Sequence, residues 1–418
     1  MSGLPERTAG TAEAPRASAW KAVICDLAAE TCQDVLGPGL RALVLTGSLA
    51  RDEATFVESQ AGAELLGDAE FLVLLAEGAR MPDAFFTDLS RRVERELARR
   101  GLRGHVSLTG CRPRYLRRLK PHIFAYELRA CGQVVRGDGR ILDLVPSFDV
   151  SAIPREDAWR LLCNRMVELV EAAAAADRKL PVGDGRPAAS PWLPPAVHYA
   201  TVKLYLDMGT SLLAFLGHFE PGYRARVARL NALARDEAYS DGLGFPLRDL
   251  ATCVEECTCF KLDPRPVPTE VSWVFVEEAL ACAHRLWRWE LAGLTGLGKD
   301  ATDDLLWESW MEQQPVPGRL RGWLQVARTQ GWLKGWRDRA RWPRLAWRAS
   351  PRYWVYRAAV ALVSGEKHAG QPGEERWEAL RDRLPAQAPD ADTAASPRRR
   401  LARDISWNYQ RFLVHTQS

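Results

Sequence analysis

The chain has 418 residues, of which 47% are hydrophobic and 26% are charged, and its formal net charge is +4. This length is more than one hydrophobic core usually holds, so we expect two or three structural units. The nearly balanced charge excludes a polyanion-binding surface that extends over the whole protein, and any basic surface must be local.

The first eighteen residues are mostly small and polar, and they lack the continuous apolar stretch of a secretory signal. We therefore expect residues 1–18 to be a disordered tail and the protein not to be exported. Nine cysteines, an odd number, favour free thiols in a reducing cytoplasm, and a cytoplasmic location is predicted. The cluster of Cys253, Cys257 and Cys259 lacks the paired two-residue spacing of a structural zinc site and is interpreted as thiols as well.

The first elements of the chain alternate between helix and strand. Ser18 is predicted to cap a helix that stops at the Gly-Pro-Gly turn of residues 37–39. Two apolar runs, residues 40–47 and 70–76, have the length and the branched side chains of buried strands. Each is expected to lie inside a sheet.

A second helix and a third strand complete this first domain. Apolar positions recur at helical spacing over residues 83–100, and Gly101 closes that helix. Residues 105–110 are a third strand candidate. The alternation predicts an α+β fold, with helices packed against a mixed sheet over residues 19–150.

Strand patterns disappear after residue 150, and long helical segments replace them. A helical domain is predicted over residues 151–295, with helices at residues 158–174, 196–216 and 271–291. Charged residues inside the apolar stretch 196–216 favour a buried helix over a membrane span. The Gly/Pro-rich residues 181–195 are expected to form a loop inside this domain. Residues 296–418 are predicted to be a Trp/Arg-rich helical extension, with a linker at 384–397 before a short terminal helix.

The end of the first strand carries a motif that suits phosphate. The sequence TGSLARDE places Gly47 and Ser48 at a strand-to-helix turn, with Arg51 following. Glycine lets the backbone come close to a triphosphate, while the serine hydroxyl, the first helical amides and the helix dipole favour an anion. Most Gly-Ser turns are turns without a ligand, so this motif alone leaves both interpretations open.

Two carboxylates open the second strand. In GDAEFLVLL, Asp68 and Glu70 flank one residue, and the strand period of two places both on the same face. Two like charges this close repel each other unless a cation lies between them, and magnesium prefers oxygen ligands. A solvated strand entrance is the alternative, but the wholly apolar run that follows favours a site at the sheet's edge.

Together the two motifs resemble the nucleotidyltransferases of the DNA polymerase β superfamily, which include antibiotic-modifying and minimal nucleotidyltransferases. The string GSLARDE is similar to the family's frequent Gly-Ser-x-x-Arg-x-Glu. The resemblance implies that Gly47 and Ser48, with Arg51 beside them, bind a nucleoside triphosphate, for which ATP is expected. It also implies that Asp68 and Glu70 hold two Mg²⁺ ions, one activating the attacking hydroxyl and one steadying the leaving pyrophosphate.

The chain departs from the family pattern in two places. The interval between Ser48 and Asp68 is longer than usual, and we expect the inserted residues 54–66 to form a loop or an extra turn over the site. The family's third carboxylate normally lies on a later strand, where this chain offers Ser107. Glu127 is the alternative third acid, because residues 121–138 resemble a stretch that follows the core strands in several of these enzymes. Glu127 is equally interpreted as a helix surface acid.

The helical domain supplies one further candidate. The segment that begins at residue 201 resembles a helix that follows the catalytic domain in related enzymes, where a lysine faces the triphosphate, so Lys203 is predicted to bind nucleotide. The alternative is a simple ion pair between Lys203 and Asp207, four residues apart. Tyr199 and Tyr223 are candidate acceptor contacts, or ordinary packing residues.

The extension has an unusual composition between residues 319 and 357, with eleven basic residues, one acid and six tryptophans. Arginine and tryptophan together suit an anionic membrane surface or nucleic acid. The alternative is an appendage that packs its tryptophans on the domain and exposes its arginines.

These patterns predict a cytoplasmic nucleotidyltransferase that uses Mg²⁺ and a nucleoside triphosphate to modify the hydroxyl of an unidentified acceptor, with a small molecule favoured. Two alternatives stay open. One is a catalytically silent nucleotide-binding or interaction protein, favoured if Ser107 replaces the third acid. The other is a membrane or nucleic-acid adaptor that acts through residues 319–357.

Overall fold

The computed structural model describes residues 14–59, 62–79, 81–176, 193–236, 239, 243–264, 272–330, 340–364, 373–389 and 395–413. The chain divides into two compact units. Unit 1 contains residues 1–153, 221–225 and 259–265, and unit 2 contains residues 154–220, 226–258 and 266–418. The boundary expected near residue 150 therefore falls at Ile153. The residues beyond 296 group with the preceding helices, so they do not form a third unit.

Unit 1 begins with helix α1 (Ala14–Leu36), which starts four residues before the predicted cap. The cap prediction was wrong, because Ser18 lies inside the helix. Alanines at positions 14 and 17 favour helix, and Pro15 is tolerated in a first helical turn. The remainder of the predicted tail, residues 1–13, lies outside the described residues. The predicted stop is confirmed, since Gly37 has a φ of +49° and residues 37–39 form the short helix η1 (Gly37–Gly39).

A mixed five-stranded sheet forms the centre of unit 1, as the sequence predicts. Its strands are β1 (Leu40–Thr46), β2 (Phe56–Ser59), β3 (Gly62–Leu75), β4 (Leu102–Cys111) and β5 (Gln133–Gly137). The long strand β3 pairs antiparallel with β1 and β2 and parallel with β4, and β5 pairs antiparallel with β1. The parallel pair is joined through helix α3 (Asp83–Arg99), which matches the predicted helix.

The insert before the acid pair was expected to be a loop, and this expectation was wrong. Residues 56–59 form β2, which pairs with the first part of β3. The physical reason is a period-two pattern, in which Ala63 and Leu65 are buried while Glu64 between them is exposed. Asp68 and Glu70 consequently lie in the middle of a long strand and not at its head.

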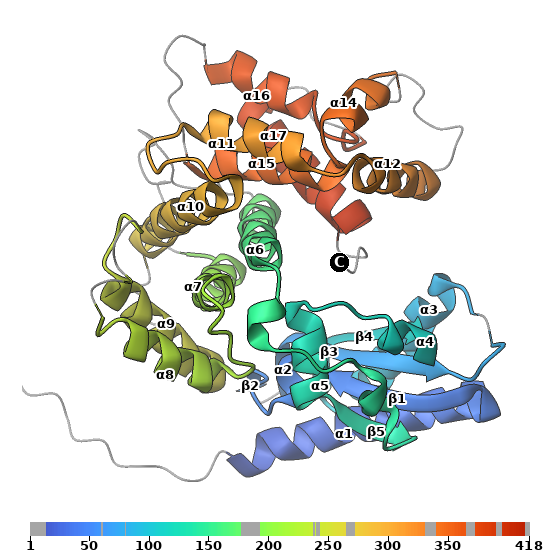
Figure 1. Cartoon of the computed structure of the whole chain (residues 1–418). Helices are drawn as coiled ribbons and strands as arrows, with labels where there is room; N and C mark the ends of the chain where they lie inside the picture. The colour runs from blue at the N-terminus through green and yellow to red at the C-terminus, as the bar shows by residue number, and fades with distance from the viewer. Residues whose placement is uncertain are drawn as a thin grey trace, which may run out of the picture. The chain divides into compact units, whose positions relative to one another are not determined.

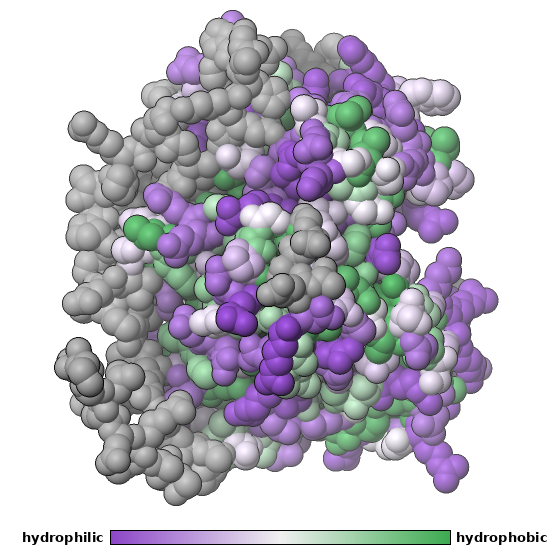
Figure 2. All heavy atoms as spheres, turned by 60° about the vertical axis from the view of Figure 1, so that its left-hand side comes forward, coloured by the Kyte–Doolittle hydropathy of each residue, from purple (hydrophilic) through white to green (hydrophobic). Residues whose placement is uncertain are grey.

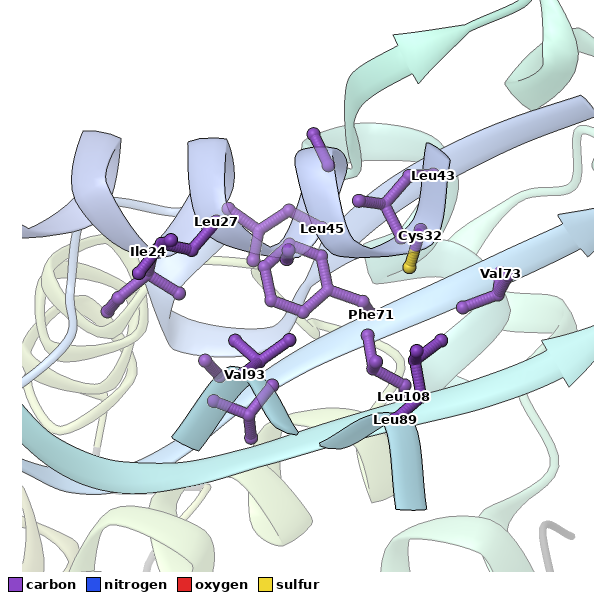
Figure 3. Close-up of a cluster of buried hydrophobic side chains, with 14 of the residues drawn as sticks. Ile24, Leu27, Cys32, Leu43, Leu45, Phe71, Val73, Leu89, Val93 and Leu108 are labelled. Carbon is purple, nitrogen blue, oxygen red and sulfur yellow. The ribbon is translucent and has the colours of Figure 1, made fainter. Parts of the chain in front are cut away.

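Both faces of the sheet carry an apolar core, because the buried residues of β1 and β3 alternate in direction. Helices α1 and α3 cover one face, where Phe71 lies among residues of both helices and of β1, as Figure 3 shows. The other face is covered by α4 (Pro113–Arg117), α5 (Ile123–Cys131) and η2 (Ile141–Leu144) (Figure 1). Leu72 and Leu74 pack on this second face.

The described residues of unit 2 form helices and loops and no strand. Two of its helices, the one that begins at Tyr223 and the one that ends at Leu262, extend into the segments of unit 1. Unit 2 begins after η3 (Val150–Ala152), and its helices are α6 (Arg155–Ala175), α7 (Pro195–Phe215), α8 (Tyr223–Leu233), α9 (Leu247–Leu262), α10 (Trp273–Thr295), α11 (Asp303–Gln313), α12 (Val316–Gln330), α14 (Trp342–Arg348), α15 (Pro351–Ser364), α16 (Gly373–Arg381), α17 (Pro397–Asn408) and the π-helical η5 (Tyr409–Leu413). The three predicted long helices correspond to α6, α7 and α10. Most of the predicted loop at 181–195 lies outside the described residues.

Helix α7 is buried on nearly all sides within its unit, as its apolar sequence predicts. Among the described residues, no helix is both long and apolar enough to cross a membrane.

Hydrophilic side chains dominate the face seen in Figure 2, with hydrophobic ones scattered between them. Such scattering is normal for a folded surface.

The C-terminal helices belong to the core of unit 2. Trp159 of α6 contacts Trp307 and Trp310 of α11 with ring centroids 5.6 and 5.2 Å apart. The Tyr356 hydroxyl of α15 donates a hydrogen bond to the Asn164 side chain of α6 at 2.5 Å, and Tyr409 donates to Glu168 at 2.7 Å. These contacts explain why the extension is not an independent module.

The linker predicted at residues 384–397 was in part wrong. Leu384, Ala386 and Ala388 are buried, and the Asn408 amide of α17 donates to the Ala386 carbonyl at 2.7 Å. Residues 384–388 therefore pack against α17 and do not form an exposed linker, because small side chains fit closely against a helix. The predicted terminal helix is confirmed as α17, and residues 390–394 lie outside the described part.

None of the nine cysteines, all of which lie in the described part of the chain, forms a disulfide. In α9 Cys253 is half-buried, Cys257 is buried and Cys259 is exposed. The three side chains therefore differ in their exposure to solvent.

Candidate functional site

The acid pair lies on an uncovered part of the sheet in unit 1. Asp68 and Glu70 are both exposed, and Ala69 between them is buried on the opposite face. They share their face with Leu72 and Leu74, which pack under α5 and its neighbours. The strand thus changes from a covered apolar surface to an exposed acidic one within two residues.

The glycine-serine turn adjoins this pair through the antiparallel pairing of β1 with β3. Thr46, the last residue of β1, is the register partner of Glu70, and its hydroxyl lies 3.4 Å from the Glu70 carbonyl oxygen. Gly47 has a φ of +70°, and a Cβ at this position would lie 2.7 Å from Oε2 of Glu70. The backbone conformation therefore favours glycine, and a Cβ here would displace the end of the Glu70 side chain.

The turn continues into α2 (Gly47–Ala50), which is a single helical turn. A dipole this short contributes little, so the predicted phosphate contact depends on close backbone approach and on the Ser48 hydroxyl. Ser48 is partly exposed, which leaves its side chain accessible.

The residues present fit a divalent metal in one respect and not in another. Two exposed carboxylates on one strand face, beside a glycine that leaves space, provide the oxygen donors that Mg²⁺ takes together with phosphate oxygens and water. Within the described ranges, however, no group of three or more His, Cys, Asp or Glu side chains is placed to hold a metal ion. The metal would therefore be held by Asp68 and Glu70 and by its nucleotide.

Strand β4 shows which residue occupies the third position. It runs parallel beside β3, with Ser107 as the register partner of Glu70 and His105 as that of Asp68. Side chains of register partners share a face of the sheet. The His105 ring lies 2.7 Å from the Glu94 carboxylate of α3, at the edge of the sheet. Ser107, a neutral residue, therefore stands next to the acid pair.

Glu127, the alternative third acid, is held in an ion pair. Its carboxylate lies 3.0 Å from the guanidinium of Arg51, which also contacts Glu53 at 3.1 Å. The Arg51 side chain is only 7% exposed. Burial disfavours its charge, yet the Glu127 and Glu53 carboxylates outweigh this effect and raise the pKa of Arg51 above its ordinary value. The structure thus brings Arg51 and Glu127 together, with both side chains committed to each other.

This ionic cluster is completed by a segment that lies far away in the sequence. The backbone amide of Tyr223 donates to Glu53 at 2.8 Å, and the Arg51 guanidinium lies 5.4 Å from the centre of the Tyr223 ring. Thr55 likewise donates to the Lys261 carbonyl at 2.8 Å. The segments 221–225 and 259–265 therefore join unit 1 through the residues that follow the Gly-Ser turn. Tyr223 had been predicted as a candidate acceptor contact, but its part in this cluster was not predicted.

Sequence reasoning missed Thr46 and Glu53. Thr46 was within reach of prediction, because antiparallel pairing of the first two apolar runs places the end of one beside the start of the other. Glu53 is the last residue of the Gly-Ser-x-x-Arg-x-Glu string, but its hydrogen bond with Tyr223, 170 residues away, could not be predicted from it.

Lys203, the last predicted nucleotide contact, belongs to unit 2. Its ammonium lies 5.3 Å from the centre of the Tyr199 ring on the same helix. Asp207, its suggested ion-pair partner, lies 2.6 Å from the Arg165 guanidinium. Packing within the helical unit accounts for Tyr199 and Asp207.

The described tryptophans between residues 319 and 357 are mostly buried. Trp323, Trp342 and Trp354 are buried, whereas Trp347 is exposed. Trp332 and Trp336 lie outside the described residues. Trp323, Trp342 and Trp354 are thus packed in the protein, as the alternative to a membrane or nucleic-acid surface expects. Trp347 does not follow this expectation, because it is exposed.

Comparisons of the chain with protein-family models, with curated proteins and with solved structures found no match. The resemblance to nucleotidyltransferases therefore depends on the motif residues and on their placement in unit 1.

Proposed function

We propose that unit 1 binds a nucleoside triphosphate with Mg²⁺ and transfers its nucleoside monophosphate to the hydroxyl of an acceptor. ATP is the first candidate nucleotide, and a small molecule is the favoured acceptor. The observation that carries the proposal is the approach of Gly47 to the Glu70 carboxylate, with a Cβ position only 2.7 Å from Oε2. A phosphate-binding turn and an acid pair thereby meet on one face of one sheet.

Each residue has a defined part in this proposal. The bare backbone at Gly47 gives the triphosphate room, and the Ser48 hydroxyl donates a hydrogen bond to a phosphate oxygen. Asp68 and Glu70 would hold Mg²⁺, which would neutralise charge on the triphosphate. The acceptor oxygen forms a bond to the α-phosphorus, the bond to the bridging oxygen of pyrophosphate breaks, and the acceptor proton leaves to a nearby carboxylate or water.

Arg51 follows α2 directly and does not itself contact the acid pair in our proposal. Its ion pairs to Glu127 and Glu53 fix the end of α2, which follows the turn. We assign it a positioning function, because its buried guanidinium is already paired. We place the reaction in the cytoplasm, since all nine cysteines lack disulfides.

The proposal is tested by the thermal shift of the full chain with each nucleoside triphosphate, with and without Mg²⁺. A ligand that binds only the folded state raises the melting temperature, by about 2–5 °C at a nucleotide concentration of about 100 Kd. The shift should require Mg²⁺ and disappear in the Asp68→Asn/Glu70→Gln variant. Glu64→Gln is the matched control, because Glu64 is an exposed acid of the same strand. No shift with any nucleotide would overturn the proposal.

A second candidate, nucleotide binding without transfer, is favoured by one observation. Ser107 stands beside Glu70, and the other acid that the sequence offered, Glu127, is paired with Arg51. Release of pyrophosphate from ATP in the presence of a panel of hydroxyl compounds distinguishes the two. A metal-dependent thermal shift without any pyrophosphate release would favour the silent protein.

A further inference from the structure

Helix α12 in unit 2 carries an apolar stripe that faces outward. Val316, Leu320 and Leu324 follow one another at four-residue spacing and are 49%, 52% and 49% exposed. Residues four apart lie one above the other on a helix, so the three form one row, here called the α12 stripe. Trp323 and Val326, on other sides of the helix, are buried. Unit 2 therefore covers only some of the apolar side chains of α12, and the stripe stays exposed to solvent.

The charged residues of the stripe's own helix and of its neighbour α14 are all basic, although acids of adjacent segments pair with two arginines here, Glu308 with Arg348 and Asp382 with Arg341. No acidic residue occurs in α12 or in α14, which packs against it through Trp323 and Trp342 with ring centroids 5.5 Å apart. Arg321 and Arg328 of α12 and Arg344 of α14 are exposed, and none of these three takes part in an ion pair within the described part of the chain.

Helix α14 adds a large aromatic side chain to the same pair of helices. Trp347 is 78% exposed, the highest exposure among the large hydrophobic residues that the structure shows at the surface. Exposing an indole ring to water is unfavourable, whereas the interface between lipid headgroups and acyl chains suits its amphipathic character.

Exposure alone does not distinguish this surface from others. Leu305 of α11 is 51% exposed, but its helix carries four acids, Asp303, Asp304, Glu308 and Glu312. The combination of a regular apolar row, an exposed tryptophan and arginines without acids is found on α12 and α14. Such a composition is typical of helices that lie in the interface of an anionic bilayer.

We infer that the α12 stripe, with Trp347, docks on the surface of an anionic lipid bilayer. The stripe enters the boundary between headgroups and acyl chains, and the arginines contact anionic headgroups. Nucleic acid fits less well, because its binding uses exposed aromatic faces for stacking, and here three exposed positions in four are aliphatic. The inference does not depend on the proposed nucleotidyltransferase function, since none of these residues belongs to unit 1.

Vesicle binding by the full chain tests the inference. The probes are vesicles of phosphatidylcholine alone and of phosphatidylcholine mixed equally with phosphatidylserine, and the readout is co-sedimentation. We expect binding to the anionic vesicles alone, falling as ionic strength rises. Because each basic residue near such a surface contributes about 1 kcal/mol, Arg321→Gln/Arg328→Gln should weaken binding by about tenfold or more.

The apolar part needs its own variant and a matched control. Leu320→Ser/Leu324→Ser should weaken binding to anionic vesicles by about tenfold. About half of each leucine is exposed, and this apolar surface would become buried in the bilayer. Leu305→Ser, an equally exposed leucine on an acidic helix, should leave binding unchanged. Arg92→Gln/Arg95→Gln, which removes two exposed arginines of unit 1, is the matching control for charge.

Three results would overturn the inference. The first is the absence of binding to anionic vesicles at low salt. The second is binding that the Leu320→Ser/Leu324→Ser change leaves intact, which would mean nonspecific charge attraction. The third is a self-associated chain whose dimer dissociates on that same change, which would assign the stripe to a second copy. Melting temperatures within about 2 °C of wild type show that the variants fold.

Discussion

The two units bury polar groups in different ways. In unit 1 the two cores that lie on the faces of the sheet consist of apolar residues, and the acid pair stands exposed where the helical cover ends. In unit 2 the helices enclose hydrogen-bonded polar groups, among them Tyr356 with Asn164 and Ser211 with Glu290. Buried groups that are paired hold helices together, whereas exposed acids on a bare strand face are available to a ligand. Of the two units, unit 1 is therefore the one that presents an exposed pair of acids on a strand face.

Among the described residues of unit 2, Glu290 is the acid with the lowest exposure to solvent. Its side chain is fully buried, and Oε1 lies 2.6 Å from the Ser211 hydroxyl, which also lies 2.7 Å from the Ala158 carbonyl. The Ser211 hydroxyl has a single proton for its two acceptors, Oε1 of Glu290 and the Ala158 carbonyl. The buried Oε2 of Glu290 has no hydrogen-bond partner among the described residues, so this environment disfavours the ionised carboxylate.

The largest effect on stability should come from the ionic cluster of Arg51, Glu53 and Glu127. This cluster is the exception in unit 1, because it contains paired charged groups that are largely buried. Arg51→Met removes the cation that lies between Glu53, which is buried, and Glu127, which is half-buried. Loss of one partner of a buried pair costs about 3–5 kcal/mol, so the free energy of unfolding in urea should fall by that order. Arg41→Met is the control, because the Arg41–Asp138 pair is more exposed and about 1 kcal/mol or less is expected. An equal effect of both changes would show that burial of Arg51 is unimportant.

A smaller effect, dependent on pH, should come from Glu290. Burial raises its pKa from 4.5 to about 8, although the hydrogen bond with Ser211 works in the opposite direction. The folded chain thus keeps a proton that the unfolded chain releases between pH 4.5 and 8. Stability from this group is complete below pH 4.5 and is lost as pH rises through 8.

Glu290→Gln should remove this component of the pH dependence. Urea unfolding of wild type and variant at pH 5, 6.5 and 8 measures it, and the wild type should lose about 3–4 kcal/mol more than the variant over this range. Parallel pH profiles for the two proteins would contradict a protonated Glu290. The neighbouring Cys163 does not interfere, because burial raises the pKa of its thiol well above its ordinary value.

A further prediction asks whether the absence of a third carboxylate beside the acid pair limits transfer by unit 1. Ser107→Asp places an acid beside Glu70, where the sequence departs from the family pattern. If unit 1 binds Mg²⁺ with ATP, pyrophosphate release should rise by about tenfold, which corresponds to about 1.4 kcal/mol of transition-state stabilisation. Ser107→Asn, which has the same shape without the charge, is the control and should give no gain. A gain from both would assign the effect to shape.

The smallest predicted effect on stability concerns the glycine turn. Gly47→Ala introduces a Cβ that meets only the end of the flexible Glu70 side chain, so the main cost arises from the φ of +70° and should be about 1 kcal/mol. The displaced carboxylate should nevertheless abolish most of the Mg²⁺-dependent thermal shift. Gly139→Ala, whose Cβ would meet nothing within 4 Å, is the control and should keep that shift.

Local patterns predicted the elements that form the site. The period of two placed Asp68 and Glu70 on one face, and helical spacing defined α3, because both depend only on neighbouring residues. The β2–β3 hairpin was missed, since acidic and small residues interrupt the apolar ones in both segments and weaken the strand signal. The pairing of Arg51 with Glu127 depends on tertiary contacts that no local pattern specifies.

Binding of Mn²⁺, which takes the same oxygen ligands as Mg²⁺, tests the central claim most directly. Electron paramagnetic resonance of Mn²⁺ in the presence of ATP counts the metal bound to the full chain, with the protein-free ATP complex as the baseline. The account predicts saturable binding in wild type and in Glu64→Gln, and its loss in Asp68→Asn/Glu70→Gln. Equal binding by wild type and the double variant would contradict the assignment of the acid pair as the metal site.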